Sequence, residues 1–371
     1  MNVMGLVFAN IYDSSLGELT NKRTMASLPY GGRYRQIDFT LSNMANAGIG
    51  HIGIITKYNY QSLMNHIGSA EEWDLELGEN GLEFLTPFSM GHTGSYRGKL
   101  EAIHSAMSYL QLSTEEYVIL ADAGVLCAID LGAVLQAHID SGKDVTVVAK
   151  TGVCNGERQT DLAVEVNGRG EVVDMAVDYR APEANLASMG IFVMKRELLM
   201  KAAEEAVARN RYRCERDFLL SAWQKGEISV NVYAFQNVAL FNESTEEFYQ
   251  NNLALLDENI RKSLFRDGLT IYTKVRDQVP SYYGEDSQVD NCVVADGCIL
   301  QGNAEHSVLF RGVQIGKNAR VKDCVIMANC IIGDDADLEC CILDKDVKVS
   351  AGSRLAGTPQ HPFILKRGDS V

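Results

Sequence analysis

The first stretch of the chain whose residue types suggest chemistry is the loop after its first apolar run. Residues 3–9 lead into N-I-Y-D-S-S-L-G at 10–17, and nucleotide phosphates usually bind where an early strand of an α/β sheet meets a tight loop. A phosphate cradle needs small residues so that backbone N–H groups can close on the anion. The only glycine here is the late Gly17, and Asp13 is expected to face a phosphate with like charge. The sequence therefore predicts a poor cradle.

Lys99 and the histidines are the other polar candidates in the first half of the chain. Lys99 follows Y-R-G at 96–98, just ahead of a helical pattern. Its ammonium there could meet a phosphate, and a solvated lysine in the first turn of a helix is the equal alternative. His104 and His138 lie inside helical patterns and need no role beyond packing or solvent contact. The seven histidines show no metal-ligand spacing, so no metal site is predicted from them.

The spacing of the cysteines favours a role in packing over metal binding. The steps from 292 to 298 and from 324 to 330 are both six residues, which places each pair at equivalent positions of a repeat. Free cysteine packs as a small hydrophobe, so buried filler is the favoured interpretation. An odd total of nine, with no C-x-x-C motif, indicates reduced thiols as in a cytoplasm. Six of the nine lie late in the chain: Cys292, Cys298, Cys324, Cys330, Cys340 and Cys341.

Charge and hydropathy limit the classes of partner. The chain has 34 Lys and Arg against 49 Asp and Glu, a net charge of −15, which repels polyphosphate, so we expect no nucleic-acid partner. A membrane helix needs about 18 or more consecutive apolar residues, and no run reaches that length. Residues 1–10 lack the basic start and cleavage site of a secretory signal. We therefore expect a soluble cytoplasmic protein with no membrane partner.

The pattern of elements predicts two domains. Apolar runs at 3–9, 51–57, 117–121 and 144–150 alternate with helical patterns at 100–110 and 131–141, which indicates a mainly parallel sheet flanked by helices. Runs at 162–166, 171–177 and 189–194 predict a mixed extension of that sheet, with a turn at 167–168. Residues 245–262 predict one long helix. The first domain is expected to span 1–264, followed by a linker over 265–280.

The last part of the chain has a different sequence pattern. Short apolar pairs recur about every six residues, with glycine, asparagine and aspartate at the corners; Ile315, Val321 and Met327 are six apart. This hexapeptide pattern is typical of a parallel β-helix, whose triangular coils need a small aliphatic residue at each inward position. Residues 281–371 are therefore predicted to form a β-helix.

Several motifs together resemble bacterial ADP-glucose pyrophosphorylase (glucose-1-phosphate adenylyltransferase). They are L-T-N-K-R at 19–23, P-Y-G-G-R-Y-R-Q-I-D-F at 29–39, L-S-N at 41–43, A-G-I at 47–49, Y-R-G at 96–98, A-S-M-G-I at 187–191 and S-V-L-F-R-G-V at 307–313. The resemblance runs essentially end to end and is greatest to the GlgD-type subunit, the partner of the catalytic GlgC-type subunit in glycogen synthesis. It implies a Rossmann-like nucleotidyltransferase domain followed by a left-handed parallel β-helix. It makes Tyr96, Arg97, Lys99 and Asp122 candidates for the substrate pocket.

This chain departs from the family pattern where the catalytic residues are expected. Catalytic members have a Gly-rich loop ending in G-x-R-L, whereas residues 13–19 read D-S-S-L-G-E-L without the arginine. Met25 replaces the lysine of A-K-P that meets the nucleotide phosphates. Ala123 occupies the position of the metal-binding aspartate in L-A-G-D-H, and Asp122 lies one residue earlier. A shift of one residue turns a side chain to the opposite face of a strand.

Two more motifs have lost their functional residue. The stretch around Asp178 aligns with F-V-E-K-P but has no lysine for the sugar phosphate, and Phe241, give or take one position, takes the aspartate's place in W-R-D-V-G-T. Mg²⁺ needs oxygen ligands that neither alanine nor phenylalanine supplies. Removing one preorganised electrostatic group typically costs on the order of 100-fold in rate. The resemblance therefore implies a weakly active or inactive subunit without a metal or cofactor, and Mg²⁺ is expected in its catalytic partner.

Some cations of the family pattern are kept. Lys22, Arg23 and Arg35, with Arg33 nearby, match family residues that bind phosphorylated allosteric effectors at the domain junction. Arginine forks and lysine point charges suit sugar bisphosphates and similar anions. The alternative is that these residues are surface charges or subunit ion pairs.

Three functional hypotheses follow. The favoured one is a non-catalytic or weakly catalytic subunit that assembles with the GlgC-type subunit, as a heterotetramer, and modulates it. The second is an active adenylyltransferase whose metal ligands have shifted by one residue, as Asp122 would allow. The third, an acyltransferase, rests on the β-helix alone, where His306 is the only histidine within the repeats.

Overall fold

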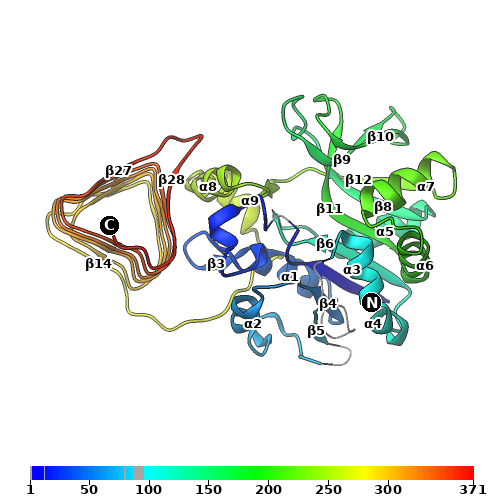
Figure 1. Ribbon diagram of the computed structural model, residues 1–371, viewed down its shortest axis with the longest axis horizontal. Coiled ribbons are helices and arrows are strands. Elements are labelled where there is room, and N and C mark those ends of the chain that lie inside the picture. Colours follow the sequence, from blue (N-terminus) through cyan, green and yellow to red (C-terminus); the bar gives the residue numbers. More distant parts are fainter. Residues whose placement is uncertain (1, 12, 79–80, 87–95) are drawn as a thin grey trace.

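The computed structural model describes residues 2–11, 13–78, 81–86 and 96–371, which form two lobes joined by an extended segment (Figure 1). The strands of the first lobe are β1 (Val3–Phe8), β2 (Pro29–Tyr30), β3 (Tyr34–Arg35), β4 (Ile52–Ile55), β5 (Leu82–Leu85), β6 (Tyr117–Asp122), β7 (Val125–Leu126), β8 (Val145–Lys150), β9 (Thr160–Val166), β10 (Val172–Tyr179), β11 (Leu186–Lys195), β12 (Val230–Phe235) and β13 (Leu240–Phe241). Its helices are α1 (Gln36–Asn46), α2 (Gln61–Ile67), α3 (Lys99–Ser105), α4 (Met107–Leu112), α5 (Leu131–Ser141), α6 (Arg196–Val207), α7 (Ser221–Gln224), α8 (Thr245–Leu253) and α9 (Glu258–Leu264).

A nine-stranded mixed sheet forms the centre of this lobe. Its order is β10-β9-β11-β6-β1-β4-β5, with β8 paired to β11 and β12 paired to β8. The pairs β6–β1, β1–β4 and β4–β5 are parallel, whereas β11 runs antiparallel to β6, β8 and β9. The expected sheet, mainly parallel at its centre and mixed beyond β6, is confirmed.

Side chains that alternate along the central strands build two separate cores. In β6, Ile119 and Ala121 join the core that contains α1, α5 and α8, and Val118 and Leu120 join the core that contains α3, α4 and α6. Successive side chains of a strand point to opposite faces, so helices on both faces are needed to bury them. In Figure 1, α1, α8 and α9 lie on the side of the sheet that faces the second lobe.

Two helix predictions were wrong in their extent. The pattern at 100–110 forms two short helices, α3 and α4, which meet at Ala106. The expected long helix at 245–262 is interrupted after α8, because Asp257 adopts an extended conformation and its carboxylate caps α9 by accepting from the N–H groups of Asn259 and Ile260. Aspartate competes with helix continuation in this way and favours the N-cap.

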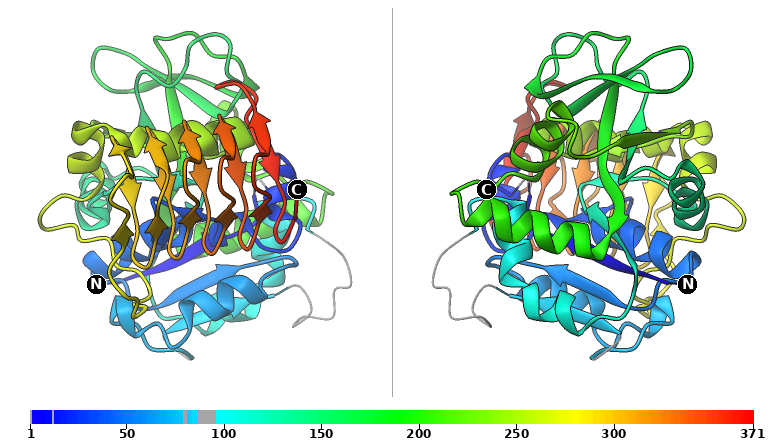
Figure 2. Two further views of the ribbon diagram at one scale, coloured as in Figure 1. Left: turned by 90° about the vertical axis from the view of Figure 1, so that its left-hand side faces the viewer. Right: turned by 90° about the vertical axis from the view of Figure 1, so that its right-hand side faces the viewer.

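The second lobe is a left-handed parallel β-helix made of three sheets of five parallel strands (Figure 2). The first sheet is β14 (Tyr282–Tyr283), β17 (Ile299–Leu300), β20 (Gln314–Ile315), β23 (Ile331–Ile332) and β26 (Lys348–Val349); the second is β15 (Val289–Asp290), β18 (Asn303–Glu305), β21 (Arg320–Lys322), β24 (Asp337–Glu339) and β27 (Arg354–Ala356); the third is β16 (Val293–Val294), β19 (Val308–Leu309), β22 (Val325–Ile326), β25 (Cys341–Leu343) and β28 (Phe363–Leu365). No helix or strand lies between α9 and β14.

The interior of the β-helix is aliphatic. Ile315, Ile332 and Val349 stack in register from coil to coil, and all three are buried. The late cysteines are free thiols, of which five are buried and Cys292 is half-buried, as the interpretation of small apolar filler predicts.

The third sheet of the β-helix packs directly on the first lobe. Val308, Val325 and Ile342 share one buried cluster with Phe248 and Tyr249 of α8, and the Tyr249 hydroxyl donates to the carbonyl of Asp323 at 2.6 Å. The two lobes therefore share a continuous core. Among the described residues, no helix is both long and apolar enough to cross a membrane.

Candidate functional site

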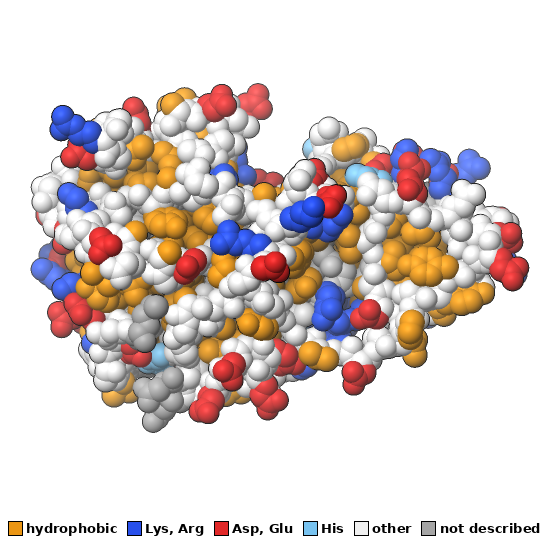
Figure 3. Space-filling model, turned by 180° about the vertical axis from the view of Figure 1, so that it is seen from behind, with side chains coloured by type: hydrophobic (Ala, Val, Ile, Leu, Met, Phe, Trp, Pro, Cys, Tyr) orange, Lys and Arg blue, Asp and Glu red, His pale blue; other side chains and the backbone are white. Residues whose placement is uncertain are grey.

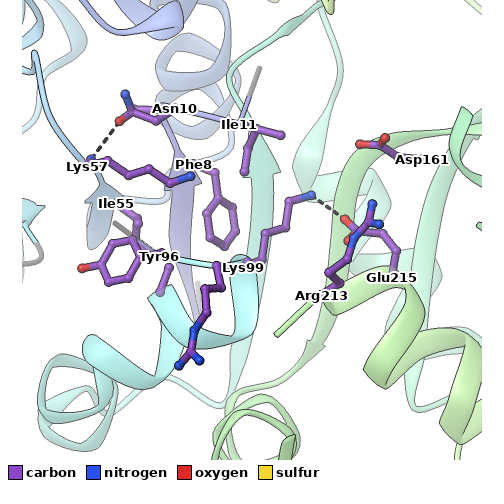
Figure 4. A pocket seen from close by; sticks show the side chains of 14 residues that line it. Phe8, Asn10, Ile11, Ile55, Lys57, Tyr96, Lys99, Asp161, Arg213 and Glu215 are labelled. Atoms are coloured by element: carbon purple, nitrogen blue, oxygen red, sulfur yellow. Dashed lines mark hydrogen bonds and ion pairs between the residues drawn. The ribbon is translucent and has the colours of Figure 1, made fainter. Parts of the chain in front are cut away.

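A cavity of about 190 Å³ opens at the carboxyl ends of β1 and β4 (Figure 4). Ligands of open α/β sheets usually bind at this edge of the parallel strands. The cavity brings together three stretches that are far apart in the sequence: the end of β1, the start of α3, and the segment before α7. It is lined by Phe8, Ala9, Asn10, Ile11, Ile55, Lys57, Tyr96, Arg97, Gly98, Lys99, Ala102, Asp161, Arg213 and Glu215.

The loop after β1 is turned inward. Asp13 is buried, and its carboxylate accepts hydrogen bonds from the Asn10 amide and, at 2.7 Å, from the backbone N–H of Met25. The expectation that Asp13 faces a bound phosphate is therefore wrong, because this carboxylate satisfies backbone and side-chain donors inside the protein. Met25 is itself fully buried and presents no charge to the cavity. Tyr12 of this loop lies outside the described residues.

Lys99 and Asp122 meet at the floor of the cavity. The Lys99 ammonium lies 2.7 Å from the Asp122 carboxylate and 2.5 Å from that of Glu215, and all three side chains are buried. The alternative of a solvated first-turn lysine is thus wrong. Burial alone would lower the pKa of Lys99, but the two carboxylates raise it above its ordinary value. Burial raises the pKa of Asp122 to about 7, against the lowering effect of Lys99.

Ala123 and Phe241, which the resemblance aligns with the two family aspartates, the second to within one position, come from two strands that pair. The short strands β7 and β13 pair so that Phe241 lies opposite Val125, two residues beyond Ala123. Ala123 is fully buried in the core on the α1 side of the sheet, and the Arg158 guanidinium stacks on the Phe241 ring at 4.9 Å. An alkyl group and a ring under a cation do not fit Mg²⁺, which requires oxygen ligands. Within the described part of the chain, no three His, Cys, Asp or Glu side chains are arranged to hold a metal ion.

The Asp178 position carries a carboxylate held by two arginines. Arg213 binds it through two hydrogen bonds of 2.6 and 2.8 Å, and Arg216 also contacts it. Asp178 has a positive φ of 53°, a conformation that aspartate tolerates better than most residues. In the alignment with F-V-E-K-P, Asp178 matches the glutamate and the exposed Tyr179 falls at the lysine position, so the motif lacks the lysine expected to hold the sugar phosphate.

Tyr96 and Arg97 lie at the mouth of the cavity. Tyr96 is buried, and burial raises the pKa of its phenol. Arg97 stacks over the Tyr212 ring at 3.7 Å and forms an ion pair with Glu101 at 2.5 Å. Both side chains remain candidates for contact with a ligand.

The basic residues of the two early motifs separate into buried and exposed groups. Arg23 is buried and binds both oxygens of Asp344 in the β-helix. Arg35 is also buried, and its guanidinium donates to the Ser62 carbonyl at 2.8 Å. Lys22 and Arg33 are exposed.

More cations join Arg23 and Arg35 at the junction of the lobes. Burial, followed by the positive charges of Arg35 and Arg23, lowers the pKa of Lys345 to about 7. Arg276 and Arg367 contribute to the lowered pKa of Arg35 in the same way. We call Arg23, Arg35, Arg276, Lys345 and Arg367 the junction cluster. Figure 3 shows Lys and Arg side chains gathered beside the hollow between the lobes.

Reasoning from the sequence missed several of these residues. Lys57 is the last residue of the predicted strand at 51–57, so its place at the carboxyl edge of the sheet was a readable signal. The sequence around Asp161, Arg213 and Glu215 gave no such signal. Asp161 reaches the cavity from β9, Glu215 from a π-helical turn over Cys214–Leu220, and Arg213 from the position just before that turn. Lys345 lies at a corner of the β-helix, where a charged residue looks like ordinary solvated surface.

Comparisons with known proteins agree across the whole chain. Residues 13–237 match the family model "Nucleotidyl transferase", and residues 278–361 match "GlmU-like, C-terminal hexapeptide". The chain is 32% identical over 366 residues to "Glycogen biosynthesis protein GlgD" of Bacillus subtilis, covering 99% of this chain and 96% of that protein. Identity to the protein of the same name from Geobacillus stearothermophilus is 33% over 370 residues, with the same coverage. The "Glucose-1-phosphate adenylyltransferase" of Bacillus subtilis is 31% identical over 323 residues, covering 86% of this chain and 84% of that enzyme.

Proposed function

Because this chain belongs to the nucleotidyl transferase family, in the group of GlgD and the glucose-1-phosphate adenylyltransferases, we propose that it serves glycogen biosynthesis as a GlgD-type regulatory subunit. In this proposal it has little or no activity of its own. It assembles in the cytoplasm with a GlgC-type catalytic subunit, as a heterotetramer, and modulates the synthesis of ADP-glucose from ATP and glucose 1-phosphate.

The observation that carries the proposal is the state of the catalytic positions. Met25, Ala123 and Phe241 are buried apolar side chains, and nucleotidyl transfer depends on cations that hold oxygens of developing charge. The hypothesis of shifted metal ligands finds no support, because Asp122 projects to the α3 side of the sheet, opposite to Ala123, and is paired with Lys99. We propose that Mg²⁺ is needed only in the catalytic partner.

The first test is the activity of the purified chain alone. We expect little or no ADP-glucose from ATP and glucose 1-phosphate in the presence of Mg²⁺. A turnover near that of an ordinary enzyme, about 10 per second, would contradict the proposal. Restoring both aspartates should not restore activity, since the loop after β1 would still lack a phosphate cradle.

The second part of the proposal assigns effector binding to the domain junction. In a chain of net charge −15, cations of the junction cluster create a local positive field that attracts phosphorylated sugars. Lys22 and Arg33 are the exposed members of the predicted set, so they can change without loss of a buried contact. Lys22→Ala and Arg33→Ala in the mixed assembly should blunt its response to sugar bisphosphates and similar anions, while its basal rate stays nearly unchanged.

A matched control is Lys201→Ala, because Lys201 is an exposed lysine on α6, in the first lobe away from the β-helix. If all three variants respond to effectors as the unaltered assembly does, the basic residues are structural only.

The third part concerns assembly. The outer row of the first β-helix sheet carries the exposed apolar residues Tyr282, Ile299 and Ile331, with Gln314 between the last two. Exposed apolar residues on a sheet face favour association with a matching neighbour. The experiment is to co-express this chain with the catalytic subunit of the same organism, measure the mass by light scattering, and compare kinetics with the catalytic subunit alone.

The expected result is a tetramer of two chain types with a lower KM or a higher kcat, since a second subunit biases its partner only through differential contacts. Copurification without a kinetic change would reduce the chain to a scaffold. Failure to associate at micromolar concentration would remove the partner from the proposal.

A further inference from the structure

Lys99 holds two carboxylates that come from different elements. It is the first residue of α3, whereas Asp122 ends β6 and Glu215 lies in the turn of 214–220. The ammonium lies between them at 2.7 and 2.5 Å (Figure 4 shows the Glu215 contact). One ammonium thus contacts two buried carboxyl groups.

A second, much smaller cavity lies behind this pair of contacts. Its volume is about 10 Å³, the space of a single water-sized probe, and it is lined by four carboxylate residues, Asp122, Asp161, Glu215 and Glu243, together with Val125 and residues 188–190 of β11. Arg158 pairs with Glu243 at 2.7 Å. So many acids around so small a space are expected to attract a cation.

One oxygen in this cavity has no partner. Asp122 is only 3% exposed, its Oδ2 accepts from Lys99, and its Oδ1 has no hydrogen-bond partner among the described residues. Buried carboxylate oxygens normally have partners, so an unpaired one indicates a missing water or ion. Gly190 leaves room for the carboxylate, because a Cβ there would lie 2.3 Å from Oδ2.

The contacts of 2.7 and 2.5 Å are those of charge-assisted ammonium–carboxylate hydrogen bonds, and the same two carboxylates are the type of ligand that a hard divalent cation takes. Ca²⁺ takes carboxylate oxygens at about 2.3–2.6 Å, and Mg²⁺ commonly uses one or two carboxylates and completes its shell with water. We propose that the Lys99 ammonium occupies a divalent-cation site formed by Asp122 and Glu215, so that the chain carries its own cation where a metal ion would otherwise bind. The residues of this site differ from Ala123 and Phe241, the family's metal positions.

The proposal explains why the acids are kept together in a pocket that has lost its metal-dependent chemistry. The ammonium is covalently attached to the first turn of α3, so it occupies the site without a binding equilibrium. A chelator cannot remove it. The ammonium also excludes a divalent ion, since two cations within about 3 Å of each other repel strongly in a buried site. The unaltered chain should therefore bind divalent ions weakly at this place.

The test is a Mn²⁺ titration of the full chain, in which bound metal is measured from the loss of the free Mn²⁺ electron paramagnetic resonance signal. Lys99→Met removes the ammonium and keeps the length of the side chain. This variant should bind one Mn²⁺ about tenfold or more tightly than the unaltered chain, because two buried carboxylates lose their counter-charge, and Ca²⁺ should displace it. Lys57→Met, a lysine of the same pocket that does not touch these acids, is the matched control and should bind as the unaltered chain does.

A second variant identifies the ligands. Adding Asp122→Asn to Lys99→Met should abolish the gained binding. The proposal is wrong if Lys99→Met gains no Mn²⁺ binding while folded, if the double variant keeps the gain, or if the unaltered chain already binds Mn²⁺ at this site as tightly as the variant.

Folding of Lys99→Met is followed in parallel, because two unpaired buried acids destabilise a protein. If the variant unfolds in chelator, Mn²⁺ or Ca²⁺ should raise its unfolding temperature, and failure of both ions to do so overturns the proposal. The inference rests on the proposed function in one respect, because it assumes that metal-dependent catalysis has been lost. Metal binding can fail while assembly with a catalytic subunit succeeds, so the two results are distinguishable.

Discussion

Asp122 and Ala123 are neighbours in the chain but lie on opposite faces of the sheet. Ala123 contributes to the core on the α1 side, and Asp122 meets Lys99 on the α3 side. The strand ends between these two positions, and the environment changes from an apolar core to a polar cavity floor. A displacement of one residue along the strand therefore turns a side chain to the opposite face of the sheet. The Asp122 carboxylate reaches the pocket, but it is one residue away from the position that aligns with the family aspartate.

Gly190 gives a prediction at the same scale. It has φ of +64°, and a Cβ there would lie 2.3 Å from the Asp122 carboxylate. Gly190→Ala should therefore lower the free energy of unfolding by more than the roughly 1–2 kcal/mol that a left-handed conformation alone costs an alanine. Urea denaturation followed by tryptophan fluorescence measures the difference.

Gly142→Ala is the control for that measurement. Gly142 follows α5 with φ of +61°, and no atom lies within 4 Å of its added Cβ. It isolates the cost of the backbone conformation. Equal losses for the two variants would mean that the Asp122 carboxylate moves aside freely when a methyl group is added at position 190.

At the scale of elements, helix ends in this protein are set by local capping. The apolar periodicity of 245–262 continues through Asp257, but its side chain accepts from two backbone N–H groups of α9. That contact ends one helix and begins another at a different angle. The break allows α8 to contact the β-helix while α9 leads into the connecting segment, as Figure 1 shows.

Asp257→Ala should therefore lower the free energy of unfolding by about 1 kcal/mol, the usual cost of an N-cap. The neighbouring Glu258→Ala removes an exposed ion pair with Lys262 and should cost less than about 0.5 kcal/mol. Chemical denaturation of both variants gives the comparison. A cost for Asp257→Ala no larger than that for Glu258→Ala would show that the break is set by packing and not by the cap.

At the scale of the whole molecule, the junction of the lobes gathers like charges that neither lobe holds alone. Arg23 and Arg35 come from the first lobe, Lys345 and Arg367 from the β-helix, and Arg276 from the connecting segment. Their mutual repulsion is relieved only in part, by Asp344 with Arg23, Asp346 with Arg367 and the nearby Asp38 with Arg35. A dianion bound there would complete the compensation.

Lys345 makes such binding dependent on pH. Its pKa in the folded chain is lowered from 10.5 to about 7 by burial and by Arg35 and Arg23. Its contribution to stability is therefore present above pH 10.5 and is lost as the pH falls towards 7. A bound dianion raises this pKa again, so binding takes up a proton at neutral and mildly alkaline pH.

We expect sulfate, which keeps two charges throughout this range, to bind more tightly as the pH falls from 8.5 to about 7, by up to about tenfold per unit, and to level off below. Isothermal titration calorimetry in two buffers of different ionisation enthalpy measures the proton uptake directly. Lys345→Met should remove the pH dependence. A pH dependence that survives in Lys345→Met would assign the proton to another group.

The sequence alone determined the fold class and predicted the loss of catalytic residues. Hydrophobic runs and six-residue repeats follow from local periodicity, which a chain carries in its own order of residues, and the strands at 117–121 and 144–150 and the helix at 131–141 were confirmed for that reason. The absence of a lysine at Met25 or an aspartate at Ala123 is also a property of single positions. Such features need no knowledge of what lies across the sheet.

Only the tertiary structure decided what the remaining charged residues do. Lys99 looks like a solvated lysine until β6 and the turn at 214–220 bring Asp122 and Glu215 to its ammonium, and Arg23 looks like a surface cation until the β-helix supplies Asp344. These partners lie 23, 116 and 321 residues away in the chain. Pairing over such separations is set by how buried faces pack, so the sequence pattern around each residue contains no record of its partner.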